Sequence, residues 1–257
     1  MAGLLEGHLA VITGASSGIG RAIAEGYARE GARIVALDQN LKGAEETCSL
    51  ITKAGGTATA HELDVTDRAA CRAVAAKVSA SIGKVSVLVN NAGITRRNPF
   101  TSPPEVADAD WDTILSINLD GVYNVTHAFI EDLRATKGRI VNIGSIQSFV
   151  HVRTPSAVAY TTSKHGVLGL TRALAAELGK DGVRVNAIGP GPTLQSIHQS
   201  AEEFAAEQAA TLTGEGASPD EIVRALRYLI SATSITGQMI AVDGGQHLMW
   251  QTPDTQL

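Results

Sequence analysis

Short apolar runs rich in Val and Ile recur along the chain and alternate with segments of helical period. The predicted strands are 9–14, 33–38, 58–64, 85–92, 139–145, 183–190 and 238–245. The predicted helices lie between them, at 18–30, 41–54, 67–82, 109–135, 157–179 and 219–231. Several strand runs are apolar almost throughout, which is typical of strands covered on both faces. The alternation therefore predicts an α/β protein whose parallel strands are joined by crossover helices.

Two helix ends carry local signals, and one segment interrupts the alternation. Gly31 follows the first helix as a C′ residue, and Ser218-Pro219 with Glu221 opens the last helix as a capping box. The segment 191–217 contains a helix of Ala and Glu and is either a lid over a ligand site or a packed surface helix. Because no composition shift indicates a linker, the sequence predicts one dinucleotide-binding and catalytic domain over 1–257.

Composition then excludes several classes of protein. The chain has 257 residues, a formal charge of −5 and no run rich in Lys or Arg, which argues against binding to nucleic acid or to an anionic membrane surface. No stretch approaches the roughly 20 apolar residues that span a bilayer, and no signal-peptide pattern precedes the first glycine-rich turn. We therefore expect a cytoplasmic protein. Cys48 and Cys71 lack the spacing of metal ligands, so we expect buried free thiols and no metal site.

A glycine-rich turn joins the first strand to the first helix. Gly14 permits a tight turn, while Gly18 and Gly20 let the backbone and the helix approach a pyrophosphate, which the helix N-terminus favours. Because a predicted strand precedes this turn and a predicted helix follows it, the prediction of a dinucleotide site is more specific than glycine spacing alone would allow. The expected contacts with the cofactor come from Gly14, Ser16, Ser17, Gly18, Ile19 and Gly20.

The ends of the next strands supply further candidates for the cofactor site. Asp38 can accept hydrogen bonds from the adenosine ribose hydroxyls and would repel a 2′-phosphate, and its neighbours Gln39 and Asn40 are uncharged. The sequence therefore predicts NAD as the cofactor rather than NADP. Asp64 and the Val65 amide are placed to read an adenine edge. Small or polar residues end the fourth strand, where the cofactor is expected to cross the backbone: Asn91, Ala92 and Gly93.

A second group of residues suits proton transfer. Ser145 ends the fifth predicted strand, and Tyr160 and Lys164 follow one helical turn apart on the next helix. A cation beside a phenol favours the phenolate and brings its pKa toward neutral pH, and Ser145 can donate to a substrate oxygen. Asn118 interrupts an Ile- and Leu-rich helical stretch, where it could kink the helix and bind a water linking Lys164 to solvent. Each of these residues alone also fits an ordinary structural role.

Together these motifs resemble the short-chain dehydrogenase/reductase family over essentially the whole chain. The matched residues are TGASSGIG at 13–20, Asp38, LDVTD at 63–67, NNAG at 90–93, Asn118, Ser145, YTTSK at 160–164, RVNAIGPG at 184–191 and VDGG at 242–245. The resemblance implies a doubly wound, Rossmann-like, seven-stranded parallel sheet in the order 3-2-1-4-5-6-7 with helices on both faces. It also implies that Tyr160 is the acid/base, that Lys164 lowers its pKa and binds the nicotinamide ribose, that Ser145 orients the carbonyl, and that Asn118 completes a relay.

The chain departs from the family pattern after the sixth strand. The resemblance implies nicotinamide contacts from Pro190, Gly191 and the residues that follow, but Thr193 and Gln195 stand where the family usually has Ile or Val and Thr. The Arg-containing turn usual before the last helix is replaced by 213–216, Thr-Gly-Glu-Gly. Both differences fall in the candidate lid.

Polar residues near the expected cleft suggest the substrate. Residues that would suit a carboxylate or a polyhydroxylated molecule are Arg96, Arg97, Gln147, His151 and Arg153. Arg96 and Arg97 could instead form surface or intersubunit ion pairs. The run NAGITRR looks like that of family members acting on sugar acids and polyols.

The leading hypothesis is a NAD-dependent oxidoreductase acting on a secondary alcohol or ketone of a small polar molecule, with sugar acids and polyols favoured. The alternatives are a NAD(P)H-dependent ketone reductase such as a 3-oxoacyl reductase, and a non-catalytic dinucleotide-binding sensor. By resemblance, helices 109–135 and 157–179 pair across a dyad, which predicts a homotetramer. Apolar residues on these helices were the expected basis of that contact: Ile114, Leu115, Val122, Val125, Phe129 and Leu133.

Overall fold

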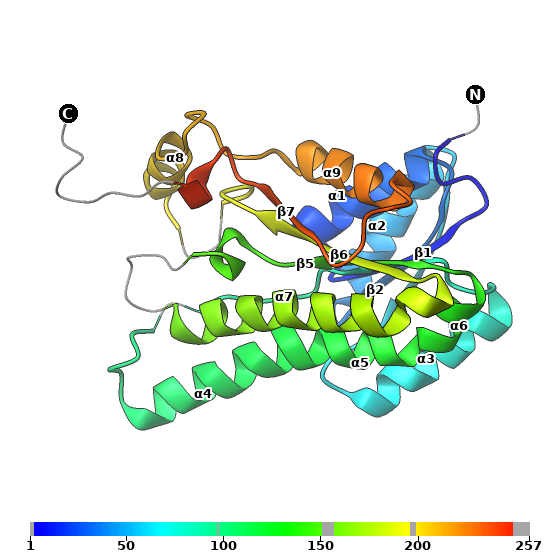
Figure 1. Ribbon diagram of the computed structural model, residues 1–257, viewed down its shortest axis with the longest axis horizontal. Helices are drawn as coiled ribbons and strands as arrows, with labels where there is room; N and C mark the ends of the chain where they lie inside the picture. Colours follow the sequence, from blue (N-terminus) through cyan, green and yellow to red (C-terminus); the bar gives the residue numbers. More distant parts are fainter. Residues whose placement is uncertain (1–2, 97, 151–156, 196–198, 249–257) are drawn as a thin grey trace.

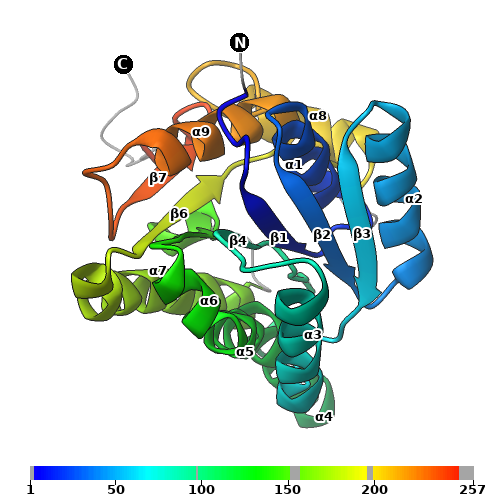
Figure 2. The same ribbon diagram turned by 90° about the vertical axis from the view of Figure 1, so that its right-hand side faces the viewer.

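The protein is described by a computed structural model over residues 3–96, 98–150, 157–195 and 199–248. In this part of the chain, seven parallel strands form one sheet in the order β3-β2-β1-β4-β5-β6-β7. Helices cover both faces of the sheet (Figures 1 and 2). The α/β class and the strand order expected from the sequence are confirmed.

Each predicted strand is present, usually shortened by one to four residues. In β1 the central residue Val11 lies opposite Val35 of β2 on one side and Leu88 of β4 on the other. The strands are β1 (Leu9–Thr13), β2 (Arg33–Asp38), β3 (Thr57–Glu62), β4 (Val87–Asn90), β5 (Arg139–Ile143), β6 (Arg184–Pro190) and β7 (Met239–Val242).

Two helical layers enclose the sheet, as Figure 2 shows. One layer contains α1 (Gly18–Arg29), α2 (Leu41–Lys53) and α9 (Pro219–Ser231). The other contains α3 (Arg68–Ser81), α5 (Gly121–Ala128), α6 (Ile130–Ala135) and α7 (Val158–Leu178). Two helices extend past the carboxyl ends of the strands, on the left of Figure 1: α4 (Pro104–Leu115), which runs beside α7, and α8 (Ala201–Ala209).

The side chains of β1 divide between two apolar cores, one on each face of the sheet. Ala10 and Ile12 pack with α1, α2 and α9, whereas Leu9 and Val11 pack with α3, α5, α6 and α7. This alternation follows from the two-residue period of a strand. Both faces are buried, which explains why the strand runs are apolar without interruption.

The local signals at helix ends are confirmed. Gly31 follows α1 with φ +90°, a left-handed conformation that glycine adopts without strain. Ser218 caps α9, and its hydroxyl and the Glu221 carboxylate reciprocally accept each other's backbone N–H groups. Cys48 and Cys71 are buried free thiols, one in each core.

The predicted helix 109–135 is wrong in its start and in its continuity. It begins at Pro104, because Pro103-Pro104 sets up a helix start that needs no amide donor. A π-helical turn at Ser116–Asp120 then separates α4 from α5, with Asn118 at its centre. The irregularity in the helix therefore takes the form of one widened turn around Asn118. Such turns occur frequently at functional sites.

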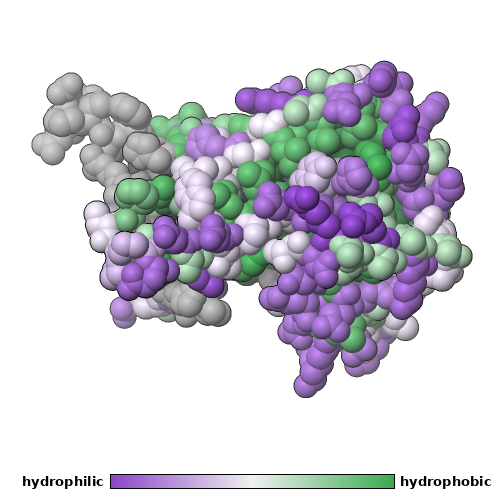
Figure 3. Space-filling model, turned by 90° about the horizontal axis from the view of Figure 1, so that it is seen from below, coloured by the Kyte–Doolittle hydropathy of each residue, from purple (hydrophilic) through white to green (hydrophobic). Residues whose placement is uncertain are grey.

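The residues expected to form a subunit contact are mostly buried within the chain itself. Ile114, Val122, Val125, Phe129 and Leu133 are all at most 5% exposed, so they pack inside the fold rather than against another copy. The large apolar side chains that are exposed on α4 and α5 are Trp111 and Tyr123. Figure 3 shows the molecule from this side, with hydrophobic surface lying among hydrophilic residues.

None of the helices in the described ranges has both the length and the apolarity needed to cross a bilayer. In this sheet, successive strands are added in one direction from β1 and in the opposite direction from β4, so the topological switch point lies between these two neighbouring strands. From β1 the chain passes into α1 on one face, and from β4 it passes toward α4 and α5 on the other. The carboxyl ends of these two strands are therefore where a crevice forms.

Candidate functional site

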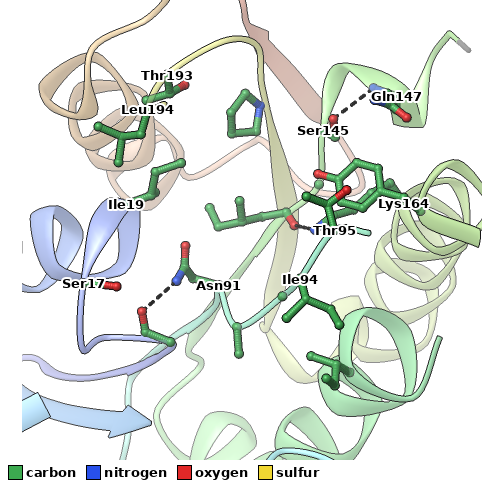
Figure 4. Close-up of a pocket in the computed structure, with 18 of the residues that line it drawn as sticks. Ser17, Ile19, Asn91, Ile94, Thr95, Ser145, Gln147, Lys164, Thr193 and Leu194 are labelled. Atoms are coloured by element: carbon green, nitrogen blue, oxygen red, sulfur yellow. Dashed lines mark hydrogen bonds between the residues drawn. The ribbon is translucent and has the colours of Figure 1, made fainter. Parts of the chain in front are cut away.

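A cavity of about 980 Å³ lies at the carboxyl edge of the sheet. It is bounded by the ends of β1, β2, β4, β5 and β6, by the start of α7 and by residues within 190–194 and 199–207 (Figure 4). The structure brings most of the predicted site residues together in its wall: Gly14, Ser16, Ser17, Ile19, Asp38, Asp64, Val65, Asn91, Ala92, Gly93, Ser145, Gln147, Tyr160, Lys164, Pro190, Gly191 and Thr193.

The glycine-rich turn forms an open cradle at one end of the cavity. Gly14 and Gly18 have φ of +65° and +58°, which side-chain-bearing residues rarely adopt. A Cβ on Gly14 would come within 3.0 Å of Ala92 and Asn91, whereas a Cβ on Gly18 would meet only Leu194, at 3.6 Å. The backbone N–H groups at the start of α1 therefore face space large enough for a phosphate pair, so this end fits a dinucleotide.

Gly20 serves a different purpose from the one predicted. It does not line the cavity; a Cβ there would lie 2.0 Å from the Gly14 carbonyl oxygen and 2.6 Å from Asn91 Nδ2. Gly20 lets α1 pack directly beneath the turn. Asn91 holds the turn from the side, because its Nδ2 donates to the Thr13 and Gly14 carbonyls at 3.0 and 3.1 Å (Figure 4).

Asp38 lies at the end of β2, and both of its carboxylate oxygens are engaged. Oδ2 accepts from the Ser16 amide and Oδ1 from the Asn40 amide, each at 2.9 Å. One cation nearby was not anticipated from the sequence. Arg21 donates to the Ser16 carbonyl and to Thr47 Oγ1, and pairs with Glu46 at 3.6 Å, outside the cavity wall.

Asp64 and its neighbours close the same end of the cavity. Asp64 Oδ1 accepts from the Thr66 amide and from Thr66 Oγ1 at 2.9 and 2.8 Å. Asp64 is thereby fixed beside Val65, which also lines the cavity. Both residues therefore lie at the cavity end where the sequence predicts the adenine.

Ser145, Tyr160 and Lys164 meet at the other end. Ser145 lies just past β5 in an extended conformation and caps a 3-10 turn, Ile146–Ser148, accepting the Gln147 amide at 3.1 Å. Lys164 lies one turn after Tyr160 on α7. Its Nζ is 5.6 Å from the centre of the Tyr160 ring and donates to the Ile143 carbonyl at 2.9 Å. The end of β5 therefore fixes Ser145 and Lys164 relative to each other.

The electrostatics of this end differ from the expectation that Lys164 lowers the pKa of Tyr160. Burial raises the pKa of Tyr160, the hydrogen bond with Ser145 opposes this, and the Glu207 carboxylate raises the pKa further. Burial also lowers the pKa of Lys164 to about 8. Desolvation of two buried groups thus outweighs their mutual attraction in the protein alone.

Asn118 does not line the cavity, and both polar atoms of its side chain are hydrogen-bonded to the protein. Its amide is fully buried, with Oδ1 accepting the Ile94 amide at 2.8 Å and Nδ2 donating to the Ile94 carbonyl at 2.9 Å and to Ser163 Oγ at 3.2 Å. A Cβ on Gly93 would be 3.2 Å from Asn118 Oδ1 and 3.6 Å from Lys164 Nζ. Asn118 therefore ties the chain after β4 to α7, beside Lys164.

The predicted substrate residues divide into three groups. Gln147 lines the cavity, and its Oε1 accepts from Thr161 at 2.7 Å. Arg96 does not line the cavity, and its guanidinium pairs with Asp110 of α4 at 3.2 Å. Arg96 therefore forms an ion pair, the alternative considered for it, in place of the expected substrate contact. Arg97, His151 and Arg153 lie outside the described residues.

The structure adds several residues that were not anticipated singly from the sequence. Phe204 and Glu207 of α8 line the cavity, together with Leu194, Gln199 and Gln246. The sequence signal was available, because Phe204 and Glu207 are three apart in a helix rich in Ala and Glu and so share a face. Thr193 is buried and donates to the Gly191 carbonyl at 3.1 Å.

The turn at 213–216 anchors the end of the candidate lid that follows α8. Thr211 Oγ1 donates to the Glu215 carbonyl at 2.9 Å, and the Thr213 amide donates to the Gly244 carbonyl at 3.1 Å, next to the end of β7. The segment is thus attached after α8, while α8 itself contains no buried residue. Few buried contacts are expected of elements that move.

Known proteins share the fold and resemble this chain over most of its sequence. Residues 8–206 match the sequence profile of the family described as short chain dehydrogenase. The chain is 41% identical to D-threitol dehydrogenase of Mycolicibacterium smegmatis, with 94% of this chain and 93% of that protein covered. It is 35% identical to a 3-oxoacyl-(acyl-carrier-protein) reductase of Thermotoga maritima, covering 94% and 98%.

A solved structure agrees along almost its whole length. A gluconate 5-dehydrogenase of Burkholderia cenocepacia, in complex with NADP and tartrate, superposes with a TM-score of 0.88 at 32% identity, with 96% of this chain and 97% of that one covered. The family resemblance drawn from the sequence is therefore confirmed. The chain is an oxidoreductase of the short-chain dehydrogenase/reductase family.

Proposed function

We propose that the protein is a NAD-dependent dehydrogenase that interconverts a secondary alcohol and a ketone on a small polyhydroxylated substrate. One observation carries the proposal. A single cavity has a phosphate-sized cradle and Asp38 at one end, and Ser145, Tyr160 and Lys164 at the other. We also propose that one domain holds both ends.

The binding roles follow the cavity wall. Residues of the turn, Gly14 to Ile19, would hold the pyrophosphate, with Gly20 supporting them from below. Asp38 would accept from the adenosine ribose, and Asp64 with Val65 would meet the adenine. The nicotinamide half would lie along Asn91, Ala92, Gly93, Pro190, Gly191 and Thr193. When bound, this cofactor supplies the hydride acceptor of the oxidation.

The protein's own residues manage the proton. Ser145 and Tyr160 both line this end of the cavity, so a substrate hydroxyl held by Ser145 would lose its proton to the Tyr160 oxygen. Lys164 stays beside the ring because its ammonium is fixed to the Ile143 carbonyl at 2.9 Å. Asn118 positions the backbone of Ile94 and the helix that carries Lys164. General-base assistance of this kind contributes about 10²- to 10⁴-fold to a rate.

NAD is proposed as the cofactor because a carboxylate stands where a 2′-phosphate would have to be accommodated. Both Asp38 oxygens are fixed by backbone amides, so the side chain cannot easily turn away. Arg21, a cation that contacts the Ser16 carbonyl, is directed to Ser16, Thr47 and Glu46.

A reductase of 3-oxoacyl substrates is the second candidate, favoured by Leu194 and Phe204 in the cavity wall and by the similarity to the Thermotoga maritima enzyme. The similarity to D-threitol dehydrogenase supports the polyol alternative. We propose a homotetramer as the working state, with the exposed Trp111 and Tyr123 at a subunit contact.

A direct test supplies the full-length protein with NAD⁺ or NADP⁺ and a panel of polyols, aldonates and 3-hydroxyacyl thioesters, and follows NADH or NADPH by absorbance. We expect oxidation of a polyol or an aldonate with NAD⁺, and its loss in Tyr160→Phe. Oxidation of the thioesters alone would assign the second candidate instead.

A further inference from the structure

Helix α8 contributes an acidic side chain to the cavity that contains Ser145 and Tyr160. Phe204 and Glu207 lie on the cavity face of α8, which stands over the carboxyl edge of the sheet in Figure 1. Gln199 Nε2 donates to Glu207 Oε2 at 2.7 Å. Gln195 Nε2 in turn donates to the Gln199 carbonyl at 2.7 Å. This chain of contacts fixes the position of the carboxylate.

The charges in the cavity wall are mainly negative. Asp38 and Asp64 belong to the cofactor end, and Asp112 and Glu207 lie nearer the other end. Among the wall residues that the structure describes, Lys164 is the one cation, and its Nζ is directed to the Ile143 carbonyl. Arg96, which could have met a substrate carboxylate, faces Asp110 instead.

Glu207 also lies within electrostatic range of the reacting atom. Glu207 lines the same cavity as Ser145 and Tyr160, and its negative charge raises the pKa of the Tyr160 hydroxyl. A substrate whose reacting hydroxyl meets Tyr160 would therefore place its other functional groups within reach of Glu207. A hydroxyl there can donate to the carboxylate, whereas a carboxylate there would meet a like charge.

We propose that Glu207 is a specificity-determining residue that accepts a hydrogen bond from a hydroxyl of a neutral polyol and excludes the corresponding sugar acid. This inference rests on the proposed function and narrows its substrate class. Gln199 holds the Glu207 carboxylate in place, and Phe204 packs the same wall. Of the two substrate classes favoured by the sequence, sugar acids and polyols, only the polyols then remain.

The size of the effect follows from the type of contact. Loss of a hydrogen bond to a charged acceptor at a half-buried position such as Glu207 costs about 10-fold in affinity. Removal of the negative charge relieves the repulsion of a substrate carboxylate by a comparable factor. The ratio of kcat/KM for a polyol to that for its aldonate is therefore the quantity to measure, and the change should appear mainly in KM.

The experiment compares a tetritol with the corresponding tetronate, and galactitol with galactonate, in the wild type, Glu207→Gln, Glu207→Asp and Glu202→Gln. Glu202 is an exposed residue of the same helix outside the cavity wall, so its variant removes the same charge without changing the site. Binding of each polyol and aldonate to the NADH complex, measured by calorimetry, gives a readout that does not depend on turnover. Thermal unfolding and NADH affinity verify that each variant is folded.

We expect Glu207→Gln to lower the polyol-to-aldonate ratio at least about 10-fold, with Glu207→Asp retaining rejection of the aldonate and Glu202→Gln unchanged. If the wild type oxidises polyols and Glu207→Gln leaves the ratio unaltered, the role of Glu207 is refuted while the proposed function stands. Preference of the wild type for aldonates also refutes it. If the wild type oxidises neither class, the proposed function fails, and the inference fails with it.

Discussion

The cofactor preference can be tested by one nearly isosteric change, Asp38→Asn. The carboxylate of Asp38 accepts from two backbone amides, Ser16 and Asn40, at 2.9 Å each. Asparagine keeps the shape and one acceptor oxygen but removes the charge. We expect the wild type to bind NADH more tightly than NADPH, and the variant to bind NADPH more tightly than the wild type does.

The magnitude follows from the charge removed. At about 4 Å, two unit charges repel by about 1 kcal/mol in water and by about 4 kcal/mol at the effective dielectric of a protein surface. Each 1.4 kcal/mol is about tenfold in affinity. The affinity for NADPH should therefore rise by about 5-fold to several hundred-fold in Asp38→Asn, while that for NADH should fall modestly.

The variant also has a cost in stability that can be measured separately. The amide NH₂ of asparagine cannot accept, so one of the two charge-assisted hydrogen bonds is lost, at about 1.5–3 kcal/mol. For a chain of 257 residues, this lowers the melting temperature by about 2–4 °C per kcal/mol.

Fluorescence titration with NADH and NADPH measures the two affinities. Glu45→Gln is the control, because Glu45 is an exposed carboxylate of α2 outside the cavity wall. A wild type that binds NADPH as tightly as NADH, or an Asp38→Asn variant with an unchanged ratio, would refute the reasoning.

Three further changes test the other parts of the site. Tyr160→Phe should reduce kcat about 10²- to 10⁴-fold with NADH affinity within about threefold, and stopped-flow measurement of turnover showing near-normal rates would contradict the role of the hydroxyl. Lys164→Met should abolish turnover and yet stabilise the fold at neutral pH by up to about 3 kcal/mol, because burial lowers the pKa of Lys164 from 10.5 to about 8. Since the unfolded chain binds that proton more tightly than the folded chain does, the stability of the wild type should increase as pH rises from about 8 to 10.5. Denaturant titrations at several pH values should show no such increase in the variant. Gly20→Ala should weaken NADH binding more than tenfold and destabilise the fold by about 1–3 kcal/mol, because the added Cβ would lie 2.0 Å from the Gly14 carbonyl oxygen. Gly179→Ala is the control, because a Cβ there has no atom within 4 Å. Calorimetry and fluorescence titration should show both quantities unaltered in this control.

The strands and the cofactor end of the site could be predicted because their signals are local. A buried parallel strand must be apolar on both faces, as Val11 and Ile12 show, and a glycine-rich turn needs only its own backbone to form a cradle. The α/β class followed from these signals, whereas the order of the strands came from the family resemblance, and Asp38 lies at the predicted strand end.

The features that were missed depend on contacts between distant segments. The direction of Arg96 is decided by Asp110, fourteen residues later on α4. The pKa of Tyr160 depends on how much solvent the fold removes from it, which no spacing of residues reveals. Asn118 could be recognised as unusual, but its partners Ile94 and Ser163 are known only from the fold.

The π-helical turn at Ser116–Asp120 links the catalytic site to the core in a way that constrains how the sequence can change. Each helical residue turns the chain by about 100°, so deleting one residue here to restore a regular helix would rotate everything downstream by that angle. Val122 and Val125, now at most 5% exposed, would leave the sheet, and Asn118 would lose its contacts with Ile94. Insertions and deletions in this turn should therefore be far less tolerated than substitutions, and a length polymorphism here would be a sign of lost activity and lost folding together.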